Sequence, residues 1–217
     1  MNPVISILLT GFEPFDGETV NPSWQAVLRA QALWDGPEDL QIVELPVDVE
    51  ACDRALAGAL DRLSPDLVIA VGQAGGRSGV SLERVALNVD DARIPDNAGF
   101  QPIDAAIVTL GPEAYFSTLP IKACVQALRQ AGIPASVSQT AGTYTCNHVF
   151  YRLMHTLRAE NPGARGGFMH IPYSPGQVVA DDRPSMSVEL ATLALLAIVR
   201  TSLEVQTDIR SPGGALH

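Results

Sequence analysis

The chain has 217 residues, a formal net charge of −10 at pH 7, 47% hydrophobic residues and 18% charged residues. This composition is typical of a globular protein and excludes a disordered one. The length suits a single domain over residues 1–217. Binding to nucleic acid is disfavoured, because it requires clustered Lys and Arg side chains that neutralise phosphates.

The pattern of apolar residues indicates neither a membrane span nor a secretion signal. No apolar run reaches the roughly 18 residues of a span, and the segment MNPVISILLTGFEPFDG lacks the basic start of a signal peptide. We therefore expect no membrane partner and a cytoplasmic location. The three cysteines, at positions 52, 124 and 146, form no close pair and no metal-ligand spacing, which disfavours a disulfide framework and a zinc site.

Short apolar strands and amphipathic helices alternate through the first third of the chain. The first strand breaks at Gly11, Pro22 occupies a first-turn position of a helix, and the third strand ends in the glycine-rich segment 72–77. This alternation favours a largely parallel sheet covered by helices on both faces, with functional loops at the carboxyl ends of the strands. The predicted elements are strands over 5–10, 40–45 and 66–71 and helices over 22–33 and 49–63.

The remainder of the chain is less regular. Residues 81–102 combine strand-like pieces with a loop rich in Asp, Asn, Pro and Gly. Gly132 and Pro134 mark the end of a helix, and the residues from Gln206 onward resemble a frayed tail. The predicted elements here are helices over 117–130, 146–157 and 187–203 and strands over 135–138 and 167–171.

Cys146 is the candidate nucleophile. It begins a predicted helix directly after the glycine-containing turn 141–145. At that position the exposed backbone N–H groups and the helix dipole favour a thiolate and lower the pKa of the thiol. The alternative interpretation is a small buried hydrophobic residue, which fits most cysteines in general.

His170 is the candidate general base. It lies at the end of a short apolar strand, just before Pro172, at the sheet edge where sites form in α/β proteins. His148 and His155 lie on the same predicted helix as the nucleophile and are weaker candidates, because a base must reach the thiol from a separate element. A core histidine that donates to a backbone carbonyl is the alternative.

Glu83 is the candidate acid that orients the histidine. Its neighbours Leu82, Val85 and Leu87 are apolar, and a carboxylate on such a strand needs a partner. An imidazole is one such partner. A surface pair with Arg77 or Arg84 is equally compatible with the pattern. Because the three candidates lie on separate elements, their spacing alone does not specify a triad.

Five segments between residues 8 and 173 closely resemble the type I pyroglutamyl peptidases, also called pyrrolidone-carboxylate peptidases. The resemblance implies a three-layer α/β/α sandwich with a largely parallel, mixed central sheet. It also implies a cytosolic cysteine peptidase that needs no metal or cofactor and commonly forms a homotetramer. Such an enzyme removes pyroglutamate (5-oxoproline) from the N-terminus of peptides through a thioester intermediate. The matching segments are LLTGFEPFDG, VGQAGGR, SLERVALNVDDARIPDNAGFQP, SQTAGTYTCNH and GFMHIPY.

The resemblance also implies roles for individual residues. The family's catalytic acid, nucleophile and histidine fall on Glu83, Cys146 and His170. Gln73 is expected near the lactam edge of the substrate and Arg93 near the oxyanion. The complete set of implied substrate-binding residues is Phe12, Phe15, Asn21, Gln73, Arg93, Ile94, Tyr144 and Thr145.

Aromatic walls suit the flat, uncharged pyrrolidone ring that Phe12 and Phe15 are expected to flank. The pair Tyr144–Thr145 departs from the family, in which many members carry Phe and Val before the cysteine, and this departure changes the polarity of the pocket. Two other functions remain compatible with such a fold. One is a nucleoside phosphorylase, which has a related architecture, and the other is a binding protein for capped peptides without catalysis.

Overall fold

The computed structural model describes residues 4–214. Within them, a six-stranded sheet has the order β2-β1-β3-β8-β4-β7, and a second sheet pairs β5 with β6. The strands are β1 (Ser6–Phe12), β2 (Asp39–Leu45), β3 (Leu67–Gln73), β4 (Val80–Glu83), β5 (Val85–Leu87), β6 (Ala114–Phe116), β7 (Ala135–Ser138) and β8 (Arg165–Ile171). The helices are α1 (Pro22–Leu33), α2 (Val49–Leu63), α3 (Ile121–Gln130), α4 (Thr145–Glu160), α5 (Val188–Glu204) and the 3-10 turn η1 (Pro175–Val178).

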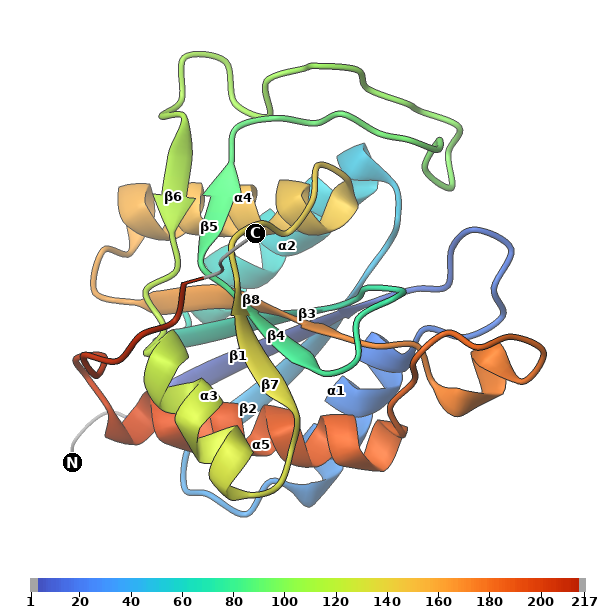
Figure 1. Ribbon diagram of the computed structural model, residues 1–217. Coiled ribbons are helices and arrows are strands. Elements are labelled where there is room, and N and C mark those ends of the chain that lie inside the picture. Colours follow the sequence, from blue (N-terminus) through green and yellow to red (C-terminus); the bar gives the residue numbers. More distant parts are fainter. Residues whose placement is uncertain (1–3, 215–217) are drawn as a thin grey trace.

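Helices cover both faces of the main sheet (Figure 1). Helices α2 and α4 pack on one face and α1, α3 and α5 on the other, with a separate apolar core on each side. Strands β1, β2, β3 and β8 are mutually parallel, whereas β4 runs antiparallel to β8 and parallel to β7. The predicted three-layer sandwich with a largely parallel, mixed sheet is thereby confirmed. Among residues 4–214, no helix combines the length and apolar character that crossing a membrane requires.

Local sequence signals explain the helix starts that were predicted well. The side chain of Asn21 accepts a hydrogen bond from Ser23 N and caps α1, which begins at Pro22 as expected. Asp48 caps α2 in the same way by accepting from Ala51 N. Both caps satisfy backbone donors that have no partner within the helix.

Two expectations for the second half were wrong. The helix predicted from residue 117 begins only at Ile121, because Pro120 disfavours helical geometry in the residue before it. Strand β6, which pairs with β5, was not predicted. The tail was expected to be frayed, yet the Asp208 carboxylate accepts hydrogen bonds from Lys122 N at 3.0 Å and Ala123 N at 2.9 Å. It thus caps α3 from a distant part of the chain. Residues 215–217 of that tail lie outside the described residues.

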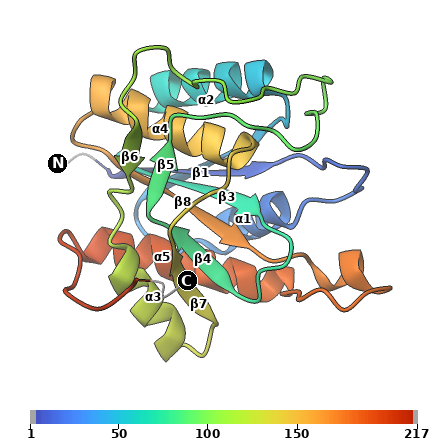
Figure 2. The same ribbon diagram turned by 45° about the horizontal axis from the view of Figure 1, so that its top comes forward.

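Between β5 and β6 the chain makes a long excursion on the side of the sheet that α2 and α4 cover (Figure 2). This excursion is fastened near the start of α2. Asn97 N donates to Val47 O at 2.8 Å, and Val49 N donates to the carboxylate of Asp96 at 3.0 Å. The first part of the excursion, residues 88–104, is called the roof loop below.

Candidate active site

The alternation of side chains along the strands brings the predicted catalytic residues to one face of the sheet. Met169 and Ile171 belong to the core beneath α1, α3 and α5, so His170 between them points to the opposite face. Leu82 belongs to the same core, which places Glu83 on the opposite face as well. Helix α4, which carries Cys146, packs on that face. The strands and α4 therefore converge on one site.

Cys146 lies in the first turn of α4, above a strand position where a side chain would not fit. A Cβ atom added to Gly72 would lie 2.8 Å from Cys146 Sγ and 2.8 Å from a ring carbon of Phe168. Gly72 is paired directly with His170 across β3 and β8, and paired residues of parallel strands point to the same face. The missing side chain at Gly72 thus lets the sulfur approach the sheet next to the histidine.

Glu83 and His170 form a buried hydrogen-bonded pair. His170 Nδ1 lies 2.8 Å from Glu83 Oε1, and the exposed fractions of the two residues are 3% and 0%. Arg77 donates to the same carboxylate oxygen at 2.6 Å and to Thr140 O at 3.2 Å. Both sequence interpretations of Glu83 therefore describe part of the arrangement, because one oxygen accepts from the imidazole and from the guanidinium. Among the described residues, Glu83 Oε2 has no hydrogen-bond partner.

Burial dominates the electrostatics of the nucleophile and the base. Desolvation, with a contribution from the Glu83 charge, raises the pKa of Cys146 to about 12. Desolvation also lowers the pKa of His170, although its hydrogen bond with Glu83 acts in the opposite direction. The expected lowering of the thiol pKa at a helix start is thus reversed. Burial thus disfavours the charged form of both groups, the thiolate and the imidazolium.

The start of α4 offers backbone donors beside the thiol. The first hydrogen bond of this helix joins His148 N to Tyr144 O at 3.1 Å, and no side chain among residues 4–214 caps it at Tyr144. The N–H groups of Thr145, Cys146 and Asn147 belong to the first turn, which has no partners within the helix. They are suited to stabilise negative charge that develops near the sulfur.

A small pocket of about 20 Å³ adjoins the thiol. None of the side chains that line it carries a formal charge at neutral pH, and two aromatic residues at its rim, Phe15 and Tyr144, have ring centres 6.3 Å apart. A volume of this size holds about one water molecule, so the rim must open to admit a five-membered ring. The lining residues are Phe12, Phe15, Asn21, Val47, Gln73, Tyr144, Thr145 and Cys146.

The polar groups of this pocket differ in their hydrogen bonding. Gln73 Oε1 accepts from Gln177 Nε2 at 3.0 Å, which leaves the Gln73 amide N–H groups as donors. The Thr145 hydroxyl is buried and has no hydrogen-bond partner among the described residues. Asn21 bonds to Ser23 and donates to Glu13 O at 2.9 Å, so its amide holds the loop that carries Phe15.

Six of the eight residues that the sequence assigned to substrate binding line the pocket, whereas Arg93 and Ile94 do not. Arg93 is exposed on the roof loop and Ile94 is half-buried. Sequence reasoning gave no binding role to Val47 and no functional role to Arg77 or Gln177. Of these three residues, the sequence pointed only to Arg77, as one possible surface partner of Glu83.

The two other cysteines do not line the pocket. All three cysteines are free thiols, and Cys124 is buried on the opposite face of the sheet. Burial raises the pKa of Cys124 to about 11 and raises that of Cys52 further above its ordinary value. Of the three, only Cys146 is partly exposed and borders the pocket.

The family model and the known proteins that match this sequence are named for one activity, that of a pyroglutamyl or pyrrolidone-carboxylate peptidase. A family model described as pyroglutamyl peptidase matches residues 5–205. The pyrrolidone-carboxylate peptidase of Clavibacter michiganensis subsp. michiganensis is 59% identical over 211 residues, which cover 97% of this chain and 99% of that protein. The pyrrolidone-carboxylate peptidase of Erwinia tasmaniensis is 55% identical over 212 residues, with 97% and 99% coverage.

Solved structures match over nearly the whole chain. Pyroglutamyl peptidase I from Bacillus amyloliquefaciens is similar with a TM-score of 0.93 and 45% identity, over 97% of this chain and 100% of that chain. The pyrrolidone carboxyl peptidase from Thermococcus litoralis is similar with a TM-score of 0.91 and 38% identity, over 96% and 100%. Given these matches and a cysteine, a histidine and a glutamate gathered on one face of the sheet, the chain belongs to the pyroglutamyl peptidase family.

Proposed function

We propose that this protein is a cysteine exopeptidase that hydrolyses the bond between an N-terminal pyroglutamate and the next residue of a peptide. The observation that carries the proposal is that Cys146 lines a pocket without charged side chains and lies over Gly72, the strand position paired with His170, which bonds to Glu83. Family membership decides against the phosphorylase and against a binding protein without catalysis. The roles of individual residues are our own assignment.

In this mechanism the thiol is activated when it attacks. Because burial disfavours the charged forms of Cys146 and His170, His170 accepts the thiol proton as the sulfur adds to the carbonyl carbon of pyroglutamate. Glu83 fixes the imidazole by bonding to Nδ1, which leaves Nε2 to take the proton, and stabilises the imidazolium that forms. The pKa directions of Cys146 and His170 favour this general-base activation over a preformed thiolate–imidazolium pair.

The remaining steps are those of acyl transfer. The tetrahedral intermediate carries an oxyanion, which the N–H groups of the first turn of α4 would stabilise, and one such donor is commonly worth about 3 kcal/mol. Collapse of the intermediate breaks the C–N bond, and His170 protonates the departing amine. A thioester between Cys146 and pyroglutamate remains. Water then attacks the thioester with His170 as base, releasing free pyroglutamate and restoring the thiol.

The pocket residues explain why a pyroglutamyl end is selected. The substrate ring has two apolar methylenes, one carbonyl acceptor and one N–H donor, but no charged amine. Phe12, Phe15 and Val47 provide apolar walls, the Gln73 amide suits the ring carbonyl, and the Thr145 hydroxyl suits either polar ring atom. An ordinary N-terminus is disfavoured, because its ammonium group would enter this pocket without a carboxylate to pair with.

Three broader features belong to the same proposal. We propose one catalytic domain over residues 1–217, supported by two cores that share one sheet. We propose a cytoplasmic location, since all three cysteines are free thiols, as is usual in a reducing compartment. The family resemblance also supports a homotetramer, which sedimentation analysis tests. It further supports a role for Arg93 near the oxyanion, which the activity of an Arg93→Ala variant tests.

Hydrolysis of a chromogenic amide of pyroglutamate tests the activity. Wild-type protein should release the dye, Cys146→Ala should not, and both should give the same circular dichroism spectrum. Cys124→Ala is the matched control, because it removes a buried thiol from the opposite face of the sheet and should keep activity. Turnover by Cys146→Ala, or no turnover by folded wild-type protein, would contradict the proposal.

A further inference from the structure

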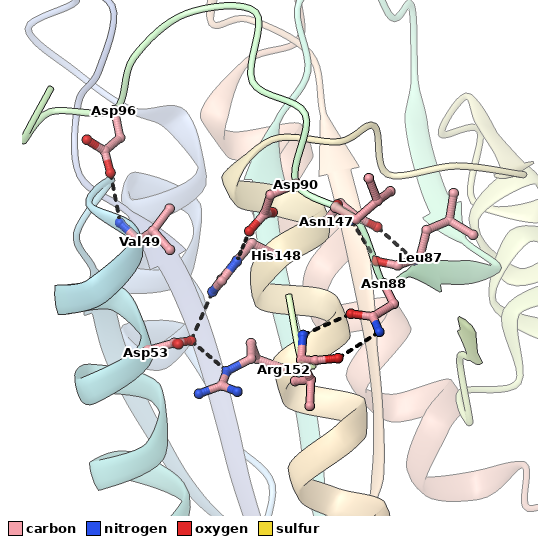
Figure 3. A network of polar contacts seen from close by, with 11 residues as sticks. Val49, Asp53, Leu87, Asn88, Asp90, Asp96, Asn147, His148 and Arg152 are labelled. Atoms are coloured by element: carbon pink, nitrogen blue, oxygen red, sulfur yellow. Dashed lines mark hydrogen bonds and ion pairs between the residues drawn. The ribbon is translucent and has the colours of Figure 1, made fainter. Parts of the chain in front are cut away.

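A second buried histidine, His148, lies two residues after the nucleophile on α4 and takes no part in the mechanism above. Figure 3 shows it between two carboxylates that come from different parts of the chain. His148 Nδ1 lies 2.7 Å from Asp90 Oδ2, and Nε2 lies 3.0 Å from Asp53 Oδ1. The His148 side chain is only 4% exposed.

This geometry determines the charge state of the ring. An ionised carboxylate only accepts hydrogen bonds, so both ring nitrogens of His148 must donate, which only the imidazolium does. Burial by itself lowers the pKa of His148, but the hydrogen bonds with Asp53 and Asp90 outweigh it and raise the pKa to about 9. Arg152 Nε also donates to Asp53 Oδ1, at 2.9 Å. Two cations and two anions thus form a compact neutral cluster.

The cluster joins three elements. Asp53 lies on α2, His148 and Arg152 on α4, and Asp90 at the start of the roof loop. The neighbouring Asn147 strengthens the link, because its side chain accepts from Leu87 N and donates to Leu87 O and Val89 O, each at 2.9 Å. The first turn of α4 therefore fastens the root of the roof loop through two consecutive side chains.

The roof loop in turn contacts the segments that line the ring pocket. Tyr144 Oη donates to Pro95 O at 3.1 Å, and Asn97 N donates to Val47 O at 2.8 Å. Asn97 Nδ2 donates to the carbonyl of Pro14, next to Phe15, at 3.0 Å. The roof loop is therefore bonded to Tyr144, to Val47 and to the residue before Phe15, which lie at three walls of the pocket.

We infer that His148 is a positioning residue, a buried cation that holds the roof loop against α4 and α2 and thereby sets the affinity of the pocket for the pyroglutamyl ring. The inference rests on the proposed function. It concerns binding of the ring and not the chemical step, since His148 bonds to Asp53 and Asp90 and has no hydrogen bond to Glu83 or His170 among the described residues.

The charge of His148 is measurable in wild-type protein without substrate. Nitrogen-15 NMR of histidine-labelled protein at pH 8 should show one of the four histidines with both ring nitrogens protonated, whereas an ordinary histidine with a pKa of about 6.5 is neutral there. The signal is assigned by its loss in His148→Gln or, if that variant does not fold, by its shift in Asp90→Asn. A neutral His148 at pH 8 would overturn the inference whether or not the protein cleaves peptides.

The effect on binding is measured with Asp90→Asn and His148→Gln. For both, KM for a pyroglutamyl amide and the inhibition constant of 2-pyrrolidone should rise by about tenfold, while kcat changes by less than about threefold. Arg152→Gln is the matched control, because it breaks the contact with Asp53 but leaves the Asp90 link, and both constants should stay within about twofold of wild type. Assays run well below each melting temperature exclude partial unfolding as the cause.

A purely stabilising cluster gives a different result. Asp90→Asn would then lower the melting temperature while KM and 2-pyrrolidone inhibition stay within about twofold of wild type, and this outcome refutes the positioning role. An equal rise of KM in Arg152→Gln also refutes the positioning role, since this variant keeps the link between His148 and the roof loop. Failure of the wild type to cleave pyroglutamyl amides refutes the proposed function instead, and 2-pyrrolidone binding measured by calorimetry still tests His148.

Discussion

Replacing His148 with Gln should remove a pH-dependent part of the protein's stability. In the folded protein the pKa of His148 is raised from 6.5 to about 9, a change of about 2.5 units, and each unit corresponds to about 1.4 kcal/mol. The imidazolium therefore contributes about 3.5 kcal/mol to the free energy of unfolding. Because the folded-state pKa is the higher one, the contribution is complete below about pH 6.5 and is lost as the pH rises through about 9.

Urea denaturation at a series of pH values between 6 and 10 measures this contribution. The difference in unfolding free energy between wild type and His148→Gln should shrink by about 3.5 kcal/mol across the series. Taking the difference cancels the titration of groups that both proteins share. Arg152→Gln keeps His148 and its two carboxylates, so it should follow the wild-type pH dependence. Parallel curves for wild type and His148→Gln would refute the buried cation.

Three further substitutions test the catalytic site itself. Gly72→Ala places a Cβ 2.8 Å from Cys146 Sγ and should lower kcat about a hundredfold by displacing the nucleophile; an unchanged kcat on the pyroglutamyl reporter would contradict the placement. Arg77→Gln removes a charge that lowers the pKa of both Cys146 and His170, so the pH profile of kcat/KM should move to higher pH, and an unmoved profile counts against Arg77. Thr145→Val should raise KM about five- to tenfold without lowering the melting temperature, because the hydroxyl has no partner among the described residues; an unchanged KM would exclude it from substrate binding.

The sequence was sufficient for elements whose signals are local. Helix α1 begins at Pro22 because Asn21 caps it, and strand β7 has the predicted limits. Strand β6 was missed because its only support is pairing with the distant β5. The cap that Asp208 supplies to α3 spans 85 residues of sequence or more, which no local pattern reveals.

The candidate site shows the same division. The position of Cys146 at a helix start is local and was predicted, whereas its contact with Gly72 depends on how α4 packs on the sheet. Residue-level reasoning left Glu83 undecided between histidine and arginine, and the structure shows why, since one oxygen serves both. The pKa of the Cys146 thiol was predicted to be lowered by the helix dipole, but desolvation raises it. Desolvation depends on how α4 packs on the sheet, which no local pattern reveals.

The burial of Cys146 bears on how this protein tolerates oxidants. Peroxides oxidise the thiolate and react slowly with the thiol. We therefore expect peroxide to inactivate this protein slowly while no substrate is bound, because burial raises the pKa of Cys146 to about 12. The burial that makes the nucleophile depend on His170 for activation would then also slow its oxidation.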